Sequence, residues 1–518
     1  MQGCFLDDEP IITDTGAVTP EFPDVSPTAI PTRNPSNPGD FTIRYDPDSV
    51  INPITSLSRD NIVISSLLYE PLFTLTSRLE AETVLCEDWS TEDWITYSFD
   101  IKENIAMSDG SMLTADDVVY TIRCAMQTGR FVNRLRIISS VELIDDFSLT
   151  IELKSANRRF IKLLDIPIIK QGSIDDPIPA GSGPYILSED DEFLLVRFAD
   201  YREYDKLQLE YICLFVCNDN EMAELFDGGV LSLLWDDPSD TYAIILNRHN
   251  EARYYDTTAL QFIGFNARST ILRDADVRRA IGYSINRSHI VDNIMPGQSL
   301  AAPLALSPAY THYDTGWEQT VVDPLIAMSV LFERAGLEDF DNDSYLEYPN
   351  GYGGYYEISL DFIVNLENSY KVQTAYLIAD TLRLYGIEII VRELHWDAFM
   401  AEISSGTYDM YYGEIVIGAD FDISLLVLPN SHLNYGLTGS DLYVPFMDAF
   451  MSADNDFDET IAAEALCNAI DLNAPFVPIL YKRYVVYTPI GVVTGASPSQ
   501  SGVFHDISSW TINHSMIP

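Results

Sequence analysis

The chain has 518 residues, of which 47% are hydrophobic and 12% aromatic. This is a globular composition, with material for several domains or for one large two-lobed body. Its 30 Lys and Arg stand against 79 Asp and Glu, which gives a formal net charge of −49. Such a surface repels phosphate backbones and anionic lipid headgroups, which excludes nucleic acid as a partner. No apolar run approaches the roughly 20 residues of a membrane-spanning helix.

The first 40 residues are expected to form a tether. Residues 5–40 contain seven prolines and one basic residue, Arg33, and they lack the apolar clusters of a packed core. This composition predicts a disordered arm. Cys4 follows a glycine, and a cysteine after a small residue is typical of a bacterial lipoprotein after signal cleavage. We therefore expect Cys4 to be lipidated and residues 1–40 to hold a globular body away from a membrane.

From Phe41 onward, short β-like runs alternate with amphipathic helices. Thr114, followed three residues later by Asp117, predicts the capped start of a helix. Pro324 after an aspartate predicts the first turn of another helix, which is expected to stop near Gly336.

Strands and helices alternate most regularly in the later part of the chain. Lys371–Tyr385 has the pattern of a helix and leads into the strand Ile387–Val391. Trp396–Ser404 has the pattern of the next helix, which is expected to close near Gly406 and to lead into the strand-like run Tyr408–Ile417. This alternation predicts an α/β domain with parallel strands.

Motifs of catalysis are missing from the sequence. The seven histidines are scattered without metal-ligand spacing, and there is no CxxC, no Gly-x-Ser-x-Gly elbow, no Ser-x-x-Lys and no Walker phosphate loop. Asp339, Asp341 and Asp343 resemble the start of a calcium-binding loop. Ser344 stands where that loop requires glycine, and Asn350 stands where it requires a bidentate glutamate, so a solvated acidic loop is favoured. The sequence thus favours a binding protein over an enzyme and predicts no cofactor.

Several segments occur in a family-specific order. The first is Asn52–Thr55, and Leu67–Phe73 and Leu85–Trp89 follow it. The most specific is Met107–Tyr120, which reads Met-Ser-Asp-Gly-Ser-Met-Leu-Thr-Ala-Asp-Asp-Val-Val-Tyr. The turn Gly181–Tyr185 and the segment Asp276–Arg287 follow. Together they resemble the family 5 extracellular solute-binding proteins of bacterial ABC importers, the oligopeptide- and dipeptide-binding group.

The resemblance implies an α/β, two-lobed periplasmic-binding-protein-like fold of type II, with an extra subdomain in the first lobe and hinged lobes around a central cleft. Two strands, at 262–266 and 474–479, would form the hinge. The implied boundaries are residues 1–40 for the tether, 41–264 with 476–518 for the first lobe, 53–178 for its subdomain and 267–474 for the second lobe.

The resemblance also implies a binding residue. In peptide-binding members, an aspartate of the second lobe meets the free amino group of the ligand, and the matching segment here is Gly418-Ala419-Asp420. The preceding strand-like run ends at Gly418, so Asp420 is expected at the carboxyl end of a parallel strand, where open α/β sheets gather their ligands. The alternative is that Asp420 only caps a turn.

Four further residues are candidates for ligand contact. Tyr69 and Glu70 match a first-lobe segment that lines the cleft in the family. The alternative is a core tyrosine and a glutamate at a strand edge. Tyr412 and Trp396 are weaker candidates, because aromatic residues at strand or helix positions usually belong to a core.

The resemblance predicts the substrate-binding component of an ABC transporter, which captures oligopeptides or dipeptides outside the cell and delivers them to a permease. It would be a monomer, anchored by lipid at the extracellular face of the cytoplasmic membrane or placed in the periplasm, with permease subunits as partners. Two alternatives stay open. The same fold could take a nickel chelate, haem, an opine or an oligosaccharide, or sense a peptide signal, and the chain could be a hydrolase on an unrecognised α/β fold.

Overall fold

The structure, a computed structural model, describes residues 40–238, 244–247, 249–318, 323–429, 431 and 433–517. The tether expected at residues 1–40 lies outside these residues except for Asp40, and Cys4 lies outside them too. Across the described ranges, no helix is both long and apolar enough to cross a bilayer.

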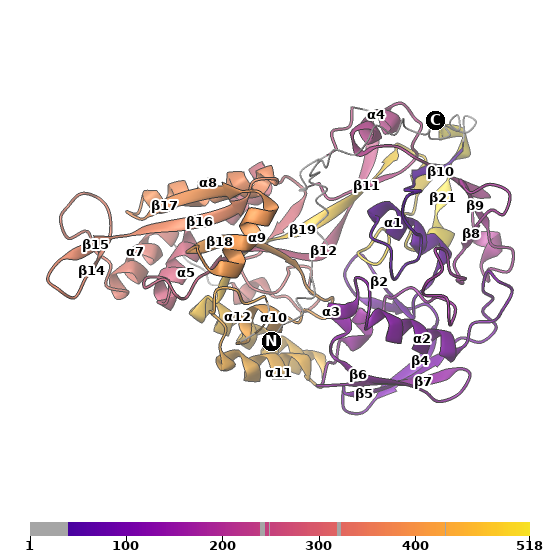
Figure 1. Cartoon of the computed structure of the whole chain (residues 1–518), viewed down its shortest axis with the longest axis horizontal. Helices are drawn as coiled ribbons and strands as arrows, with labels where there is room; N and C mark the ends of the chain where they lie inside the picture. Colours follow the sequence, from indigo (N-terminus) through magenta and orange to yellow (C-terminus); the bar gives the residue numbers. More distant parts are fainter. Residues whose placement is uncertain are drawn as a thin grey trace, which may run out of the picture.

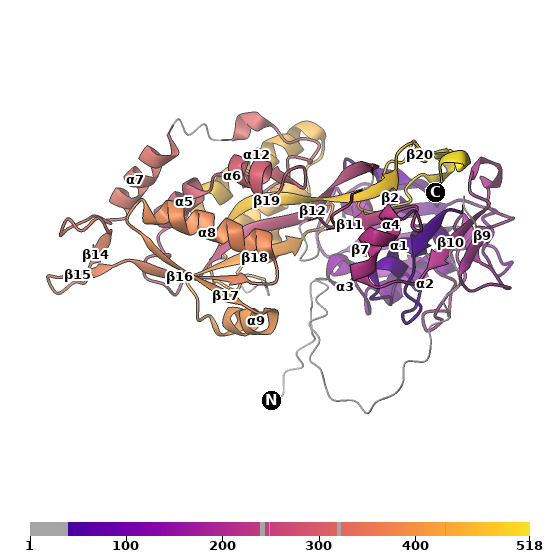
Figure 2. The same cartoon turned by 90° about the horizontal axis from the view of Figure 1, so that it is seen from above.

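The chain forms two lobes joined by two long neighbouring strands (Figures 1 and 2). These strands, β12 (Asn250–Phe265) and β19 (Phe476–Pro489), pair antiparallel and run from one lobe into the other. We call the residues before β12 and after β19 the first lobe, and those between them the second lobe. The strands expected for a hinge, at 262–266 and 474–479, thus lie at the second-lobe ends of longer strands. The predicted α/β, two-lobed fold class is confirmed.

The main sheet extends from the second lobe along the connecting strands. Its strand order is β11-β19-β12-β18-β16-β17, and β13 lies beside β19. The pairs β16–β17 and β16–β18 are parallel, as predicted, whereas β18 pairs antiparallel with β12. The bounds are β11 (Leu234–Asp236), β13 (Ser299–Ala301), β16 (Ser359–Asn365), β17 (Glu388–Leu394) and β18 (Met410–Val416).

Helices cover both faces of this sheet. Side chains alternate along a strand, so Phe262 packs in a core with α9, α11 and α12, whereas Ile263 packs in a second core with α5, α7 and α8. The first set is α9 (Trp396–Ser405), α11 (Val444–Met451) and α12 (Asp456–Asn473). The second set is α5 (Ala275–Ser284), α7 (Pro324–Arg334) and α8 (Ser369–Arg383).

The predicted helix starts and stops are confirmed. Helix α2 (Ala115–Ala125) begins with a capping box, in which the Thr114 N–H donates to the Asp117 carboxylate at 2.9 Å. Helix α7 begins at Pro324, and Gly336 follows its end with a φ of +75°. Gly406 ends α9 with a φ of +71°, a left-handed conformation that glycine adopts at little cost.

The first lobe holds two four-stranded sheets around one core. The first sheet has the order β1 (Thr42–Arg44), β10 (Tyr211–Phe215), β9 (Leu194–Arg197) and β8 (Tyr185–Leu187). The second is antiparallel, with the order β4 (Cys86–Thr91), β5 (Thr96–Ile101), β7 (Ser148–Leu153) and β6 (Ile138–Leu143), and α2 packs on it.

Shorter elements complete the two lobes. Those of the first lobe are α1 (Arg59–Leu68), β2 (Phe73–Leu75), β3 (Ala81–Thr83), α3 (Val132–Leu135), α4 (Met222–Asp227), β20 (Val493–Thr494) and β21 (Thr511–Ile512). Those of the second lobe are α6 (Arg287–His289), β14 (Glu347–Pro349), β15 (Tyr355–Glu357) and α10 (Ser424–Val427).

Contacts between side chains also join the lobes away from the connecting strands. The turn between β2 and β3 places Leu79 in the second-lobe core, where it is 1% exposed. Asn157, Arg158 and Arg159 of the first lobe contact carboxylates of the second lobe. These contacts fix the position of the loop that follows β18, where the candidate site lies.

Candidate ligand-binding cleft

A cleft of about 800 Å³ lies between the two lobes. The first lobe contributes part of α1 and residues 127–137, and the second lobe contributes the end of β18 with the loop after it. Residues of the connecting strands, among them Tyr255 and Lys482, line the cleft as well. A cleft of this size, between two lobes, is typical of a small-molecule or short-peptide site.

The predicted segment Gly418-Ala419-Asp420 lines this cleft. It follows the carboxyl end of β18, which pairs in parallel with β16, so the expected place of Asp420 is confirmed. A Cβ atom at Gly418 would lie 2.3 Å from Asp420 Oδ1 and 3.1 Å from Leu163 Cδ2. Glycine at this position therefore lets the Asp420 carboxylate fold back against the loop.

The Asp420 carboxylate is buried among neutral donors. It is 3% exposed, Oδ2 accepts from Asn157 Nδ2 at 2.8 Å, and Oδ1 accepts from the Asp422 N–H at 3.3 Å. Arg159 donates to the Asp420 carbonyl oxygen, at 2.8 Å, and no cationic side chain of the described ranges forms an ion pair with the carboxylate. Burial raises the pKa of Asp420, and the charge of Asp422 adds to the rise. A cation brought by a ligand would relieve this buried negative charge.

Tyr69 and Glu70 lie elsewhere, in a buried network of the first lobe. Arg202 donates to the Glu70 carboxylate through both terminal nitrogens, each at 2.6 Å, and Ser182 Oγ donates at 3.0 Å. The Tyr69 hydroxyl donates to the Pro179 carbonyl at 2.9 Å. Neither residue is among those that line the cleft. Their role in ligand binding stays a prediction.

Tyr412 and Trp396 also lie away from the cleft lining. The Tyr412 hydroxyl donates to Gln261 Oε1 at 2.9 Å, and its ring packs in the core beneath α5, α7 and α8. Trp396 opens α9, where its half-buried ring stacks on Phe399 with 5.9 Å between ring centroids. The contacts of both side chains are those of core residues, and their role in ligand binding also stays a prediction.

The sequence interpretation missed the charge of the cleft. Among the described residues, six basic side chains and six carboxylates line it, so their formal charges sum to zero in a chain of net charge −49. They are Arg59, Arg130, Arg134, Arg136, Lys371 and Lys482, with Asp165, Asp237, Glu367, Glu414, Asp420 and Asp422. A signal was present in the sequence, because Gly129–Arg136 holds three arginines in eight residues of an otherwise acidic chain.

Charges along the connecting strands neutralise one another. Lys482 of β19 forms ion pairs with Asp237 and, at 2.9 Å, with Glu414 of β18. Lys371 reaches the other oxygen of Glu414 at 2.8 Å. Burial works to raise the pKa of Glu414, but the two lysines lower it overall, and their carboxylate partners raise the pKa of Lys482. This network forms a fully paired polar wall rather than a free charge.

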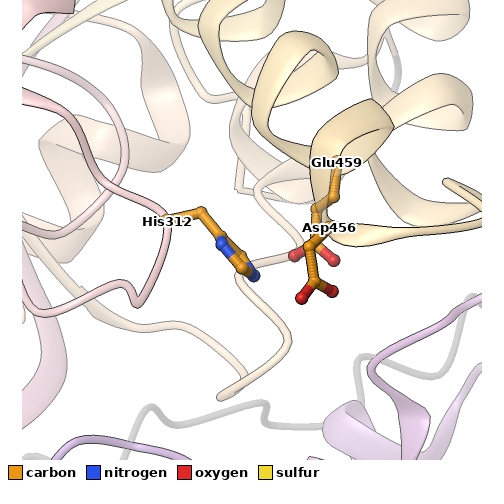
Figure 3. A group of neighbouring side chains, drawn as sticks. All are labelled: His312, Asp456 and Glu459. Atoms are coloured by element: carbon orange, nitrogen blue, oxygen red, sulfur yellow. The ribbon is translucent and has the colours of Figure 1, made fainter.

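Within the described part of the chain, two groups of side chains have the spacing of metal ligands. In the first, His312 lies beside Asp456 and Glu459 of α12 (Figure 3). Arg158 donates to both carboxylates at 2.5 Å, and Arg159 donates to Glu459 at 2.9 Å. This group is therefore an ion-pair junction between the lobes, already neutralised by two guanidinium groups.

The second group is the acidic loop whose sequence resembles the start of a calcium-binding loop. Ligand atoms of Asp339, Asp341, Asp343 and Glu347 lie within 4.8 Å of one another. Carboxylate oxygens of Asp339 and Asp341 accept from the Asp343 N–H, and Glu347 accepts from the Phe340 N–H at 2.7 Å. These hydrogen bonds account for the compact loop, and we assign no ion to it.

Two lobes joined by paired strands around a cleft with charged side chains in its lining are the architecture of a solute-binding protein, and comparison with known proteins gives the family. The chain belongs to the bacterial extracellular solute-binding proteins, family 5, whose middle region matches residues 80–432. The resemblance identified from the sequence is thus confirmed.

Individual relatives are distant. The oligopeptide-binding protein AppA of Bacillus subtilis is 22% identical over 387 residues, which are 70% of each chain. The glutathione-binding protein GsiB of Escherichia coli K12 is 24% identical over 307 residues, 56% of this chain and 57% of GsiB. The structure of B. subtilis AppA in complex with a nonapeptide matches with a TM-score of 0.66 at 20% identity, covering 92% of this chain and all of that one. NikA from Brucella suis, in complex with Fe(III)-EDTA, matches with a TM-score of 0.71 at 16% identity over the same shares.

Proposed function

We propose that this protein is the extracellular substrate-binding component of an ABC importer and that it captures peptides without a catalytic step of its own. The observation that carries the proposal is the Asp420 carboxylate, which is buried in the interlobe cleft without a cationic partner among the described residues. The amino terminus of a peptide supplies such a cation. The names of AppA and GsiB support a peptide ligand.

The contact between Asp420 and an amino group would be strong enough to select the ligand. Each carboxylate oxygen accepts one hydrogen bond within the protein, and a carboxylate oxygen can accept a second. At 4 Å and an effective dielectric constant near 20, two opposite charges attract by about 4 kcal/mol before desolvation is subtracted. The neutral hydrogen bonds from Asn157 and Asp422 would hold the carboxylate in place for this contact.

Delivery would depend on closure of the two lobes and on membrane partners. The paired strands β12 and β19 are the covalent links between the lobes and would serve as the hinge. In this proposal the protein acts as a monomer and passes its ligand to permease subunits. A lipid on Cys4 would anchor it at the extracellular face of the cytoplasmic membrane, or it would act in the periplasm.

A panel of peptides from two to nine residues tests the peptide ligand. A peptide present at 100 times its Kd stabilises the native state by about 2.7 kcal/mol, which raises the unfolding temperature. Native mass spectrometry of the purified protein would show a ligand that copurifies. Small-angle scattering of a saturated sample is expected to give a smaller radius of gyration than the free protein. Failure of every peptide in the panel to raise the unfolding temperature would contradict the proposal.

A chelate of a metal with carboxylates is a second candidate ligand. It is favoured by the six basic side chains that line the cleft and by the match to NikA in complex with Fe(III)-EDTA. Fe(III)-EDTA added in place of peptide would distinguish the two ligands. Stabilisation by the chelate, together with no response to any peptide, would make the chelate the ligand.

A further inference from the structure

We propose that Arg130, on the first-lobe wall of the cleft, binds an anionic group of the ligand and that this group is a carboxylate. The inference rests on the proposed solute-binding function and adds the chemistry of a second contact, opposite in sign to that of Asp420. A planar guanidinium group with parallel N–H donors matches the two oxygens of a carboxylate.

Arg130 lines the cleft without a partner for its charge. Its side chain is half-buried, and its Nε is fully buried yet donates no hydrogen bond. It forms no ion pair with any residue in the part of the chain that the structure describes. Its guanidinium carbon lies 4.7 Å from the centroid of the Phe131 ring. A guanidinium group without a counterion at a cleft wall is stabilised by an anionic group that a ligand brings.

Asp165, whose charge acts on Arg130, already has other partners. Arg134 shares the ring of Phe131, at 5.1 Å from its centroid, and forms an ion pair with Asp165. The second oxygen of Asp165 accepts from Ser501 Oγ at 2.7 Å. Two guanidinium groups therefore stand beside one occupied carboxylate, and one positive charge is left over. Burial and the charge of Arg134 lower the pKa of Arg130 to about 10, so the side chain is still charged at neutral pH.

Two further carboxylates of the cleft, Glu414 and Asp422, are paired with other basic side chains. Lys371 and Lys482 neutralise Glu414, and Arg136 lies 3.8 Å from Asp422. Asp420 is buried on the second-lobe side without a cation. Among the described residues of the cleft, Asp420 and Arg130 thus present a negative and a positive charge without an ion-pair partner. A zwitterion, such as a peptide with both termini free, complements this arrangement, whereas a ligand with only an amino group leaves Arg130 unpaired.

The test compares Arg130→Gln with wild type by calorimetry, using pentaalanine and its C-terminal amide as probes. If Arg130 binds the carboxylate, the variant is expected to bind pentaalanine about 30-fold or more weakly, because the partner of a buried charge has been removed. The amide is expected to bind the two proteins within about 3-fold, since it carries no carboxylate. Arg383→Gln, which removes the same charge at an exposed position of α8, controls for the net charge of the chain. Equal affinity of variant and wild type for pentaalanine, or an equal loss for the acid and the amide, would overturn the inference.

The unliganded variant separates a binding role from a structural one. An arginine without a counterion contributes little to folding, so Arg130→Gln is expected to unfold at the same temperature as wild type or at a higher one. A fall of many degrees in the absence of ligand would show that the guanidinium group stabilises the wall itself, and the inference would be wrong.

Two further probes, citrate and Fe(III)-EDTA, distinguish failure of this inference from failure of the proposed peptide binding. If wild type binds no peptide of the panel, the proposed function fails, and the same two variants are then compared with citrate and with Fe(III)-EDTA. A loss of about 30-fold or more in Arg130→Gln alone would still support a carboxylate site at Arg130. A wild-type protein that binds neither pentaalanine nor these polycarboxylates would overturn the inference.

Discussion

Two buried carboxylates of the second lobe, Glu459 and Asp420, face the same short segment of the first lobe. Each is 3% exposed. Arg158 and Arg159 donate to Glu459, and Tyr310 adds its hydroxyl at 2.5 Å. Asp420 accepts from the neighbouring Asn157 amide instead. Equal burial is thus combined with opposite surroundings, a charged pair in one case and neutral hydrogen bonds in the other.

The difference shows which carboxylate is available to a ligand. Burial alone would raise the pKa of both groups, but Arg159, the Tyr310 hydroxyl and Arg158 lower the pKa of Glu459 overall. The pKa of Asp420 is raised, because the Asn157 hydrogen bond and the more distant charge of Arg159 do not outweigh burial and Asp422. We infer that Glu459 joins the lobes and that Asp420 binds the ligand. Four substitutions can break or sharpen this comparison.

The largest expected effect is the loss of folding stability caused by Glu459→Gln. The substitution leaves the buried Arg159 without its ion-pair partner, and breaking a buried pair in this way costs about 3–5 kcal/mol. The measurement is the free energy of unfolding in denaturant, with Glu464→Gln on the exposed side of the same helix as the control. Loss of stability in the control to the same extent would contradict the assignment.

The pH dependence of stability provides an independent check on Glu459. Its folded pKa lies below the ordinary value of 4.5, so the folded protein binds fewer protons here than the unfolded chain does. The stabilisation by the charged Glu459 is therefore complete above the ordinary pKa of 4.5. It is lost as the pH falls through the lowered pKa of the folded protein. The gap in stability between wild type and Glu459→Gln is expected to narrow in acid, and a gap that widens would contradict the ion pair.

Asp420→Asn is expected to act on affinity rather than on stability. Removing one partner of a buried charge pair costs about 2–5 kcal/mol, which is about 30-fold to several thousand-fold in Kd for a peptide with a free amino group. The N-acetylated peptide is the control, and its affinity is expected to change little. Because the pKa of Asp420 is raised, binding of the free amine should weaken with falling pH sooner than it would with an ordinary aspartate. Equal affinity of both proteins for the free amine would show that Asp420 does not bind it.

Glu70→Gln extends the comparison to the carboxylate that Arg202 neutralises. It is expected to lower the free energy of unfolding by about 1–3 kcal/mol, because the buried Ser182 and the Arg202 guanidinium group lose a charged acceptor. Peptide affinity is expected to stay within about 3-fold of wild type. A variant of normal stability and weak affinity would instead support the ligand contact that the sequence predicts for Glu70.

The smallest expected effect is that of Gly418→Ala. The added methyl group would meet Asp420 Oδ1 and displace the carboxylate from its hydrogen bonds. We expect about a tenfold loss of affinity for a free-amine peptide, equivalent to about 1.4 kcal/mol. In the Asp420→Asn background the same change should have almost no further effect on affinity. If the affinity losses of the two substitutions add fully in the double variant, Gly418 does not act through Asp420.

Much of the fold could be predicted from the sequence because its signals are local. Pro324, Gly336 and Gly406 mark helix ends through their own backbone preferences, and the structure has them there. The strand before Gly418 could be recognised from its apolar run. Its parallel partner followed from the strand–helix–strand alternation, so the place of Asp420 could be predicted as well.

The remainder of the site depends on which distant residues meet. Tyr69 and Glu70 matched the family as Asp420 did, and Tyr412 and Trp396 were weaker candidates. The side chains of all four are engaged in cores and hydrogen-bond networks away from the cleft. The sequence of Arg130 and its neighbours showed a local excess of arginine but not which arginine would lack a carboxylate.

The sequence by itself therefore determined the family, the two-lobed α/β class and one segment of the cleft, since these follow from local patterns and their order along the chain. The tertiary structure alone decided the state of each buried charge. Asp420 meets Asn157 across 263 positions, and Glu459 meets Arg159 across 300. Desolvation and Coulomb interactions act over a few ångströms in space, so the partner that neutralises a charge, or its absence among the described residues, becomes visible only when the chain is folded.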